Sequence, residues 1–158
     1  MKKILYVPHP ILRQKSLDLK SIEKEDFLLA EEMMDIMLRA PGVGLAANQI
    51  GVLKKIITIN IQDKEKNLDN KYILFNPKII SSSKETVIME EGCLSLPGQF
   101  AEIDRPSECD VEYLDYNGEK KFLHATGLLS TCLLHETDHL QGRLFIDYLS
   151  KLKKEMII

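Results

Sequence analysis

The feature that most constrains the fold is a pair of histidines near the carboxyl end of the sequence. His135 and His139 are four residues apart, and Glu136 directly follows the first of them. On an α-helix, residues four apart lie one turn above each other on the same face, so both imidazoles can bind one metal ion. Glu136 lies about 100° further round the helix and borders the same site as a candidate general base. This H-E-x-x-H pattern is typical of metal-dependent hydrolases.

The helix that carries these residues is expected to span 126–140 and to be buried. Thr126 is a candidate N-cap and Gly142 a candidate stop, and leucines lie on all sides of the segment. Burying ionisable side chains costs several kcal/mol each unless they are paired or bind metal. A hydrogen-bonded polar cluster would also satisfy them, so the motif alone leaves a metal site and a structural cluster both open.

A catalytic site of this kind needs a third protein ligand, with a fourth position left open. After His139 the only acidic residues are Asp147 and Glu155, and neither stands in a recognisable setting. Cys132 lies on the motif's own helix, but three ligands from one helix make a poor tetrahedron. Cys93 is the better candidate, because a Cys-His-His set suits Zn²⁺ or Fe²⁺.

Apolar periodicity predicts where the other elements lie. Helix formers with apolar residues three and four apart predict an amphipathic helix over 25–39. Its core-facing residues are expected to be Phe27, Ala30, Met33, Met34, Met37 and Leu38. Short β-branched runs predict strands at 55–61, 72–75, 78–80, 86–89, 109–114 and 120–123. Residues 63–71 are expected to form a charged loop and residues 1–20 an irregular strap across the core.

This order of elements favours an α+β fold. We expect antiparallel β-sheets packed around a central C-terminal metal-binding helix, with a second helix near the N-terminus. Asn117-Gly118, between two of the predicted strands, indicates a β-hairpin. With 158 residues and no linker-like segment, we expect a single catalytic domain over 1–158.

Charge and cysteine content indicate which partners and which cell compartment to expect. A net charge of −3 and a pI near 5.8 give no sign of a broad nucleic-acid-binding surface. The three cysteines are an odd number, which favours reduced thiols in a cytoplasmic protein. The apolar run at the start ends at Pro8, too short for a secretory signal, and no run approaches the roughly 20 residues of a membrane span. No membrane association is expected.

Three segments together resemble the peptide deformylase family. They are 42–49 (G-V-G-L-A-A-N-Q), 91–95 (E-G-C-L-S) and 135–139 (H-E-T-D-H), in the family's order and spacing. The resemblance extends from Val7 to Asp147, nearly the whole chain. It implies a hydrolase that removes the N-formyl group from nascent polypeptides beginning with formyl-methionine, with release of formate.

The resemblance also implies a role for each matching residue. One divalent ion, Fe²⁺ in the first place and Zn²⁺ or Ni²⁺ as replacements, would be bound by Cys93, His135 and His139. The chemistry would use the Glu136 carboxylate as general acid and base, with the Gln49 amide and the Leu94 N–H as oxyanion donors. The substrate would contact Gly42, Val43, Gly44 and Glu91. A pocket for the methionine side chain would contain Ile88, Leu128 and Cys132.

Some positions lie outside the family pattern. Phe100 stands where some members carry a substrate-contacting arginine. We hypothesise that the nearby Arg105 pairs with Asp138 and braces the metal-binding helix. Residues 151–158 leave little room for the longer C-terminal helix with which many members dock on the ribosome, so only weak ribosome attachment is expected. We also expect a monomer.

Two alternatives remain at this point. A metallopeptidase of the general H-E-x-x-H kind would take its third ligand from beyond His139, and would keep its metal without Cys93. A non-catalytic, metal-stabilised binding module would be unaffected by loss of the Glu136 carboxylate.

Overall fold

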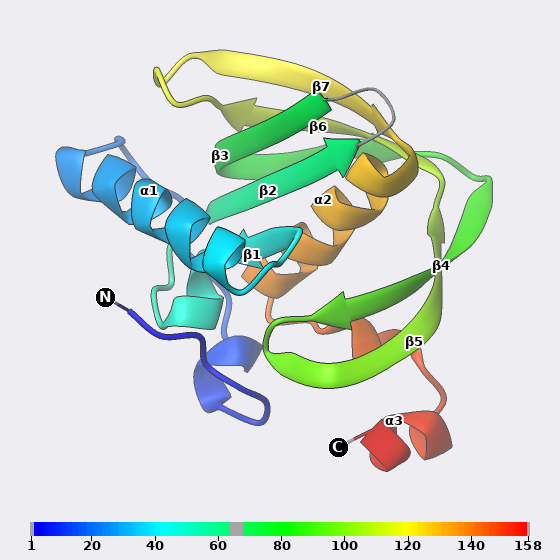
Figure 1. The fold of residues 1–158 in the computed structure, drawn as a ribbon. Helices are drawn as coiled ribbons and strands as arrows, with labels where there is room; N and C mark the ends of the chain where they lie inside the picture. Colours follow the sequence, from blue (N-terminus) through cyan, green and yellow to red (C-terminus); the bar gives the residue numbers. More distant parts are fainter. Residues whose placement is uncertain (1, 64–67, 158) are drawn as a thin grey trace.

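The computed structural model describes residues 2–63 and 68–157 of the chain (Figure 1). A five-stranded antiparallel sheet has the order β1-β2-β3-β6-β7, and β4 and β5 pair separately. The strands are β1 (Gly44–Ala46), β2 (Ile56–Asp63), β3 (Leu68–Ser82), β4 (Thr86–Cys93), β5 (Leu96–Pro106), β6 (Glu108–Leu114) and β7 (Lys120–Thr126). The helices are α1 (Lys24–Arg39), α2 (Gly127–Leu140) and α3 (Lys151–Ile157), with 3-10 turns η1 (Pro10–Arg13), η2 (Ala47–Ile50) and η3 (Phe145–Tyr148).

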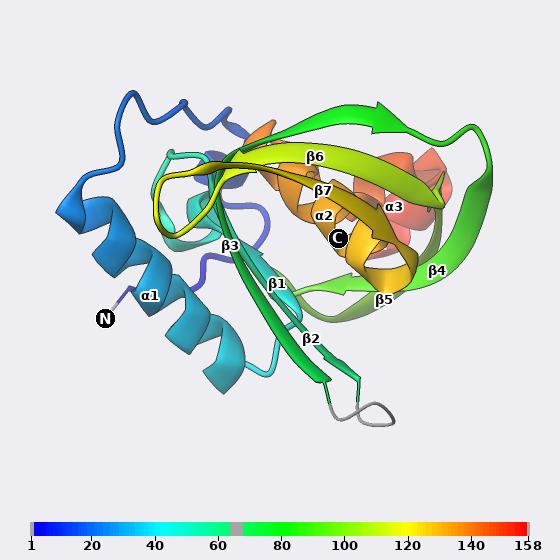
Figure 2. The same cartoon turned by 90° about the horizontal axis from the view of Figure 1, so that it is seen from above.

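Helix α2 is the central element of the fold. It lies between the five-stranded sheet and the β4–β5 pair, and α1 covers the other face of the larger sheet (Figure 2). The predicted α+β architecture, with antiparallel sheets around the C-terminal motif helix, is therefore confirmed. None of the helices in 2–63 and 68–157 is long and apolar enough to cross a membrane.

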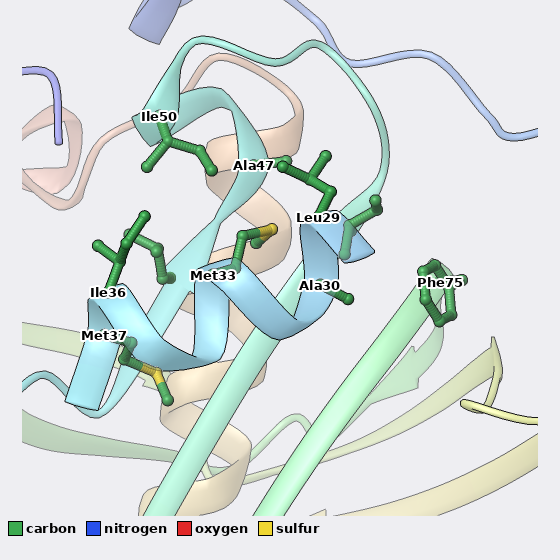
Figure 3. Packing of buried hydrophobic residues seen from close by; sticks show 10 residues of the cluster. Leu29, Ala30, Met33, Ile36, Met37, Ala47, Ile50 and Phe75 are labelled. Carbon is green, nitrogen blue, oxygen red and sulfur yellow. The ribbon is translucent and has the colours of Figure 1, made fainter. Parts of the chain in front are cut away.

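Alternation along β2 builds one core on each face of the sheet. Ile57 and Ile59 pack toward α2, whereas Ile56 packs with α1, because successive strand residues point to opposite faces. Figure 3 shows the α1 cluster, in which Met33 and Met37 are fully buried. The core-packing interpretation of these methionines is confirmed.

The buried face of α1 differs slightly from the predicted one. Leu29 and Ile36 are in the core, whereas Leu38 is 38% exposed. The prediction for Leu38 is wrong because the apolar stripe is broad, and the docking angle of the helix decides which of its edges is covered.

Three strand predictions are also corrected. The predicted strands at 72–75 and 78–80 form one strand, β3, that continues through a bulge at Asn76 and Pro77. The bulge accommodates Pro77, which has no N–H for the ladder. The predicted loop at 63–71 is shorter, since β2 extends to Asp63 and β3 begins at Leu68, and residues 64–67 lie outside the described residues. Strands β1 and β5 were not predicted, nor were the three 3-10 turns and the helix α3.

The ends of α2 match their predictions in position. Thr126 is the N-cap residue, although its side chain makes no capping hydrogen bond. Gly142 has φ 77° and its N–H donates to the His139 carbonyl at 3.0 Å, which ends the helix in the left-handed conformation that favours glycine.

Asp147 fastens the segment after α2 to the N-terminal strap. Its Oδ2 accepts from Arg13 at 2.6 Å and from the Leu144 N–H at 3.0 Å, and Lys154 donates to its Oδ1 at 3.0 Å. Burial opposes its charge, but these bonds outweigh burial and lower the pKa of Asp147 to about 2. The carboxylate is therefore better stabilised in the folded chain than in the unfolded one.

This pKa makes stability depend on acid pH. Because the folded pKa lies below the usual value of 3.8, the contribution of Asp147 is present above pH 4 and is lost as pH falls toward 2. In metal-free protein, Asp147→Asn is expected to lower the free energy of unfolding at pH 7 by on the order of 1–2 kcal/mol, with the deficit disappearing in acid. Urea unfolding at several pH values measures it. Asp18→Asn, at an exposed ion pair with Lys55, is the control and should change little. An equal deficit for Asp147→Asn at pH 2 and pH 7 would contradict the prediction.

Candidate metal centre

The three predicted ligands meet between the two sheets. Cys93 is the last residue of β4, and His135 and His139 lie one turn apart on α2. One potential ligand atom from each of the three lies within 4.8 Å of the others, and His139 Nε2 is 3.3 Å from Cys93 Sγ. Within 2–63 and 68–157, this is the one group of three such side chains with the spacing of a metal site.

Both imidazoles are oriented for metal binding. His135 Nδ1 donates to Glu91 Oε1 at 2.8 Å, which leaves Nε2 free to face the other ligands. His139 presents Nε2 to the thiol, and Asn48 Nδ2 donates to its carbonyl oxygen at 2.6 Å. Two imidazoles and one thiol, held by a β-strand end and a helix, form a donor set that fits Zn²⁺ or Fe²⁺.

Burial and hydrogen bonding affect the two histidines differently. Burial, reinforced by the charge of His135, lowers the pKa of His139 well below its usual value. Burial also disfavours the charge on His135, but its hydrogen bonds with Cys93 and Glu91 and the charge of Glu136 raise its pKa to about 10. Metal ligation requires neutral imidazole, so a metal ion competes with a proton at His135 but not at His139.

A buried ion-pair network extends from His135 to the surface. Arg105 donates from Nε and Nη2 to the two oxygens of Glu91 at 2.6 and 3.0 Å, and from Nη1 to Asp138 at 2.9 Å. Tyr148 donates to the same Asp138 oxygen at 2.7 Å, and the Arg105 guanidinium lies 4.8 Å from the centre of its ring. The hypothesised contact between Arg105 and Asp138 is present, whereas the roles of Glu91 and Tyr148 in the network were missed.

The Glu91 carboxylate is bound by other side chains, and its contact with substrate stays a prediction. It borders the cavity but is 5% exposed, and its carboxylate oxygens are bound by Arg105 and His135. Burial alone would raise its pKa, but the hydrogen bonds from His135 and Arg105 lower it. Only the register of the β4–β5 ladder could have predicted this arrangement. Val87 pairs with Arg105 in that ladder, and Glu91 lies on the same face of β4 as Val87.

The Glu136 carboxyl lies beside the ligands in a dry position. It is 3% exposed, and its Oε1 has no hydrogen-bond partner in the part of the chain that the structure describes. Burial raises its pKa to about 7, although the charge of His135 opposes the shift. On its other side is Gly44, where a Cβ atom would lie only 2.5 Å from Oε2. The glycine therefore makes room for this carboxylate.

The predicted oxyanion donors flank the thiol. Gln49 Oε1 accepts from the Ala46 N–H at 2.9 Å, which fixes the amide so that Nε2 lies 3.1 Å from Ser95 Oγ and 3.4 Å from Cys93 Sγ. Leu94 directly follows the thiol and lines the adjoining cavity. Their roles toward an oxyanion stay predictions.

A cavity of about 470 Å³ opens beside these residues. The predicted substrate contacts Gly42, Val43, Gly44 and Glu91 line it, together with Phe100, which packs its ring over Gly92. Of the expected methionine pocket, Leu128 and Cys132 are lining residues.

The prediction for Ile88 is wrong. Ile88 is 63% exposed and does not line the cavity, because β4 turns alternate residues to opposite faces. Met89, on the inward face, contacts Thr131 Oγ1 through its sulfur at 3.0 Å.

The other candidate ligands, Cys132 and Asp147, are unsuited to metal binding or already paired with other side chains. Cys132 is outside the three-residue group, and burial raises the pKa of its thiol to about 12, which keeps it protonated. Asp147 is bound by Arg13 and Lys154. The geometry thus favours Cys93 over any ligand that follows His139.

Comparisons with known proteins agree with this geometry. The family model described as polypeptide deformylase matches residues 1–155. The chain is 54% identical to a peptide deformylase of Pelagibacter ubique over all of its length and 91% of the relative, and 46% identical to one of Rhizobium meliloti over 90% of that relative. Two solved structures of the Ehrlichia chaffeensis peptide deformylase, one in complex with actinonin, each have a TM-score of 0.95. They are 38% and 39% identical, and the match covers all of this chain and 93% and 94% of theirs.

Proposed function

The chain belongs to the polypeptide deformylase family, and we propose that Cys93, His135 and His139 bind its metal ion while Glu136 carries the proton of the reaction. The protein is a metal-dependent hydrolase that removes the N-formyl group from nascent polypeptides. The observation that most supports the residue assignment is the convergence of one thiol and two imidazoles beside a buried carboxyl in one cavity.

Different residues of the chain perform different steps of amide hydrolysis. A divalent ion in a three-ligand site supplies Lewis acidity and lowers the pKa of a water toward neutrality. Glu136 takes a proton at Oε1 and returns it to the departing amine, a contribution of about 10²–10⁴ in rate. Gln49 Nε2 and the Leu94 N–H donate to the oxygen that gains negative charge, each worth about 10²–10³ in rate.

The peptide lies along strand β1. This strand is at the edge of the five-stranded sheet, so one side of Gly44–Ala46 pairs with β2 and the other is free to pair with an extended substrate. Gly42 and Val43 continue this edge along the cavity wall. The methionine side chain enters the apolar part of the cavity next to Leu128 and Cys132.

Other features complete the proposal. The native ion is Fe²⁺, with Zn²⁺ or Ni²⁺ as replacements, since the mixed sulfur and nitrogen donors accept all three. Residues 1–158 act as one catalytic domain. The protein works in the cytoplasm as a monomer, with at most weak attachment to the ribosome.

Formate release from formyl-Met-Ala tests the function directly. Protein loaded anaerobically with Fe²⁺ or Ni²⁺ is expected to release one formate per peptide. Folded, metal-loaded protein that releases none would refute the assignment.

Arg105 is proposed to brace the metal centre through Glu91 and Asp138. Arg105→Ala removes the guanidinium from the buried Glu91 carboxylate, and should lower the free energy of unfolding by about 3–5 kcal/mol. It should also speed metal loss to a chelator, because Glu91 orients His135. Arg39→Ala, at an exposed pair with Asp35, is the control and should cost less than about 1 kcal/mol. Wild-type stability and metal retention in Arg105→Ala would count against the bracing role.

A further inference from the structure

Residues 2–7, the first part of the N-terminal strap, join two of the hydrophobic clusters. The Lys2 N–H donates to Glu32 on α1 at 2.9 Å, and Ile4 packs against the α1 cluster. Val7 packs instead against a cluster of β5 and η3 residues, against which Cys93 also packs. The segment therefore connects α1 with the β4–β5 side of the metal centre.

Two backbone hydrogen bonds attach this segment to residues beside the metal ligands. The Leu5 N–H donates to the Gln49 carbonyl at 2.7 Å, and the Val7 N–H donates to the Ser95 carbonyl at 3.0 Å. Gln49 and Ser95 are 1% and 0% exposed, and Gln49 Nε2 lies 3.1 Å from Ser95 Oγ. The three stretches thus form a closed ring of hydrogen bonds, which includes Gln49 and the residue that follows Leu94.

The Gln49 carbonyl finds its partner in this segment. Gln49 lies in η2, a 3-10 turn of four residues. Carbonyl groups at the end of so short a helix have no partner within it, and the Leu5 N–H supplies one. The Leu5 side chain also lies close to Gly51, since a Cβ atom there would be 3.8 Å from Leu5 Cδ1. Leu5 therefore holds η2 through both its backbone and its side chain.

The turn that follows the thiol is held in a similar way. Leu94 and Ser95 form the turn between β4 and β5, and the ladder shifts register just before it, between Gly92 and Cys93. The irregular ladder leaves this turn less constrained by strand pairing. The Val7 N–H binds it at the Ser95 carbonyl and so restrains the turn to which the Leu94 N–H belongs.

We propose that residues 2–7 position the two oxyanion donors for the reaction. Leu5 holds Gln49 in place, and Val7 holds the turn that carries the Leu94 N–H. The proposal rests on the proposed function, which makes these two groups the donors. Donors stabilise a transition state when they are fixed before the reaction, and a misplacement of 1 Å can cost about 10²-fold in rate. Leu5 and Val7 do not line the cavity, so they act through their partners.

A double-mutant cycle tests this positioning role. Leu5→Pro removes the N–H that binds Gln49, and should lower kcat for formyl-Met-Ala about tenfold with KM and metal content unchanged. Gln49→Ala removes the amide donor itself and should lower kcat by about 10²–10³-fold. Because Leu5 acts through Gln49, Leu5→Pro should cost less than about twofold in the Gln49→Ala background. A segment that only stabilises the fold would slow both backgrounds equally.

Val7→Pro should show a different pattern from Leu5→Pro. It removes the N–H that binds Ser95, so it acts on the turn that carries the other donor, Leu94. Its loss in kcat, also about tenfold, should therefore persist in the Gln49→Ala background. General loosening of the segment would give the two proline variants the same pattern.

Two further variants serve as controls. Lys3→Pro places proline in the same segment at an exposed residue whose N–H takes no part in the ring of hydrogen bonds, and should keep the wild-type kcat. Leu5→Ala keeps the N–H and shortens the side chain beside Gly51, so it should fold and lower kcat about two- to threefold, again only when Gln49 is present. If circular dichroism shows that Leu5→Pro does not fold, the cycle with Leu5→Ala decides the proposal.

The outcomes separate this proposal from the proposed function. Wild-type kcat in the Leu5 variants would overturn the proposal, as would equal losses in both backgrounds or an equal loss in Lys3→Pro. Wild-type kcat in Gln49→Ala would instead overturn the oxyanion role of Gln49, and the positioning role of Leu5 with it. Absence of formate release by the metal-loaded wild type would overturn the proposed function itself.

Discussion

Glu136→Gln is expected to lower kcat for formyl-Met-Ala by about 10²–10⁴-fold while the protein keeps its metal. The carboxyl lies beside the ligand group but is not one of the three ligands. Glutamine retains the shape of the side chain and its fit against Gly44, but it cannot take up and return a proton. The loss should therefore appear in kcat rather than in KM, and steady-state kinetics combined with metal analysis measure it.

The stability of the same variant provides a second readout. The pKa of Glu136 is raised to about 7, so its neutral form is favoured in the folded state, and stability falls as pH rises from 4.5 toward 7. In metal-free protein at pH 8, Glu136→Gln should be at least as stable as the wild type. Glu102→Gln, at an exposed position of β5, is the control and should leave kcat and stability unchanged. Wild-type turnover in Glu136→Gln would contradict the catalytic role of Glu136, and loss of metal would make Glu136 a ligand.

Cys93→Ala is expected to lose metal and, with it, activity. Loss of a partner that only orients a ligand weakens metal binding by about 10–100-fold, so loss of a ligand should weaken it by more than about 100-fold. Chelator competition followed by formate release measures both effects. The reason is geometric, because Cys93 Sγ is 3.3 Å from His139 Nε2, and Asp147, the acidic residue of η3, is already paired with Arg13 and Lys154.

Cys132→Ser is the matched control for the thiol. Cys132 lines the cavity and is protonated, with a pKa of about 12, so its replacement should leave metal content intact. If Cys93→Ala kept its metal and its activity, the third ligand would come from elsewhere, as in the metallopeptidase alternative.

The local sequence pattern was sufficient to predict helices α1 and α2. Helix α2 has an N-cap candidate, apolar residues on all sides and a glycine at its end, and α1 has a long amphipathic pattern. Strand β5 lacked such a signal, because its sequence alternates weakly and is charged and interrupted by Pro97 and Gly98. It becomes a strand only because β4 pairs with it along its length.

Side-chain partners across the sheets were the hardest to predict. Glu91 was expected to touch substrate; it lines the cavity, but its pairing with Arg105 and His135 was not predicted. Ile88 was expected in the cavity, and the alternation of β4 turns it to solvent. A shift of one residue in strand register exchanges the two faces, so partners across strands depend on a register that the residues of one strand alone do not specify.

The motif predicts that two imidazoles and a carboxylate lie together, because four-residue spacing on a helix is a local geometric rule. The three motifs of the sequence also identified the family before any contact was known. The folded chain adds three contacts that no local rule predicts: Cys93 reaches His139, Gly44 makes room for Glu136, and Glu91 orients His135. Each of these contacts joins α2 to a strand distant in sequence, and such contacts depend on how two sheets pack on one helix rather than on the periodicity of any segment.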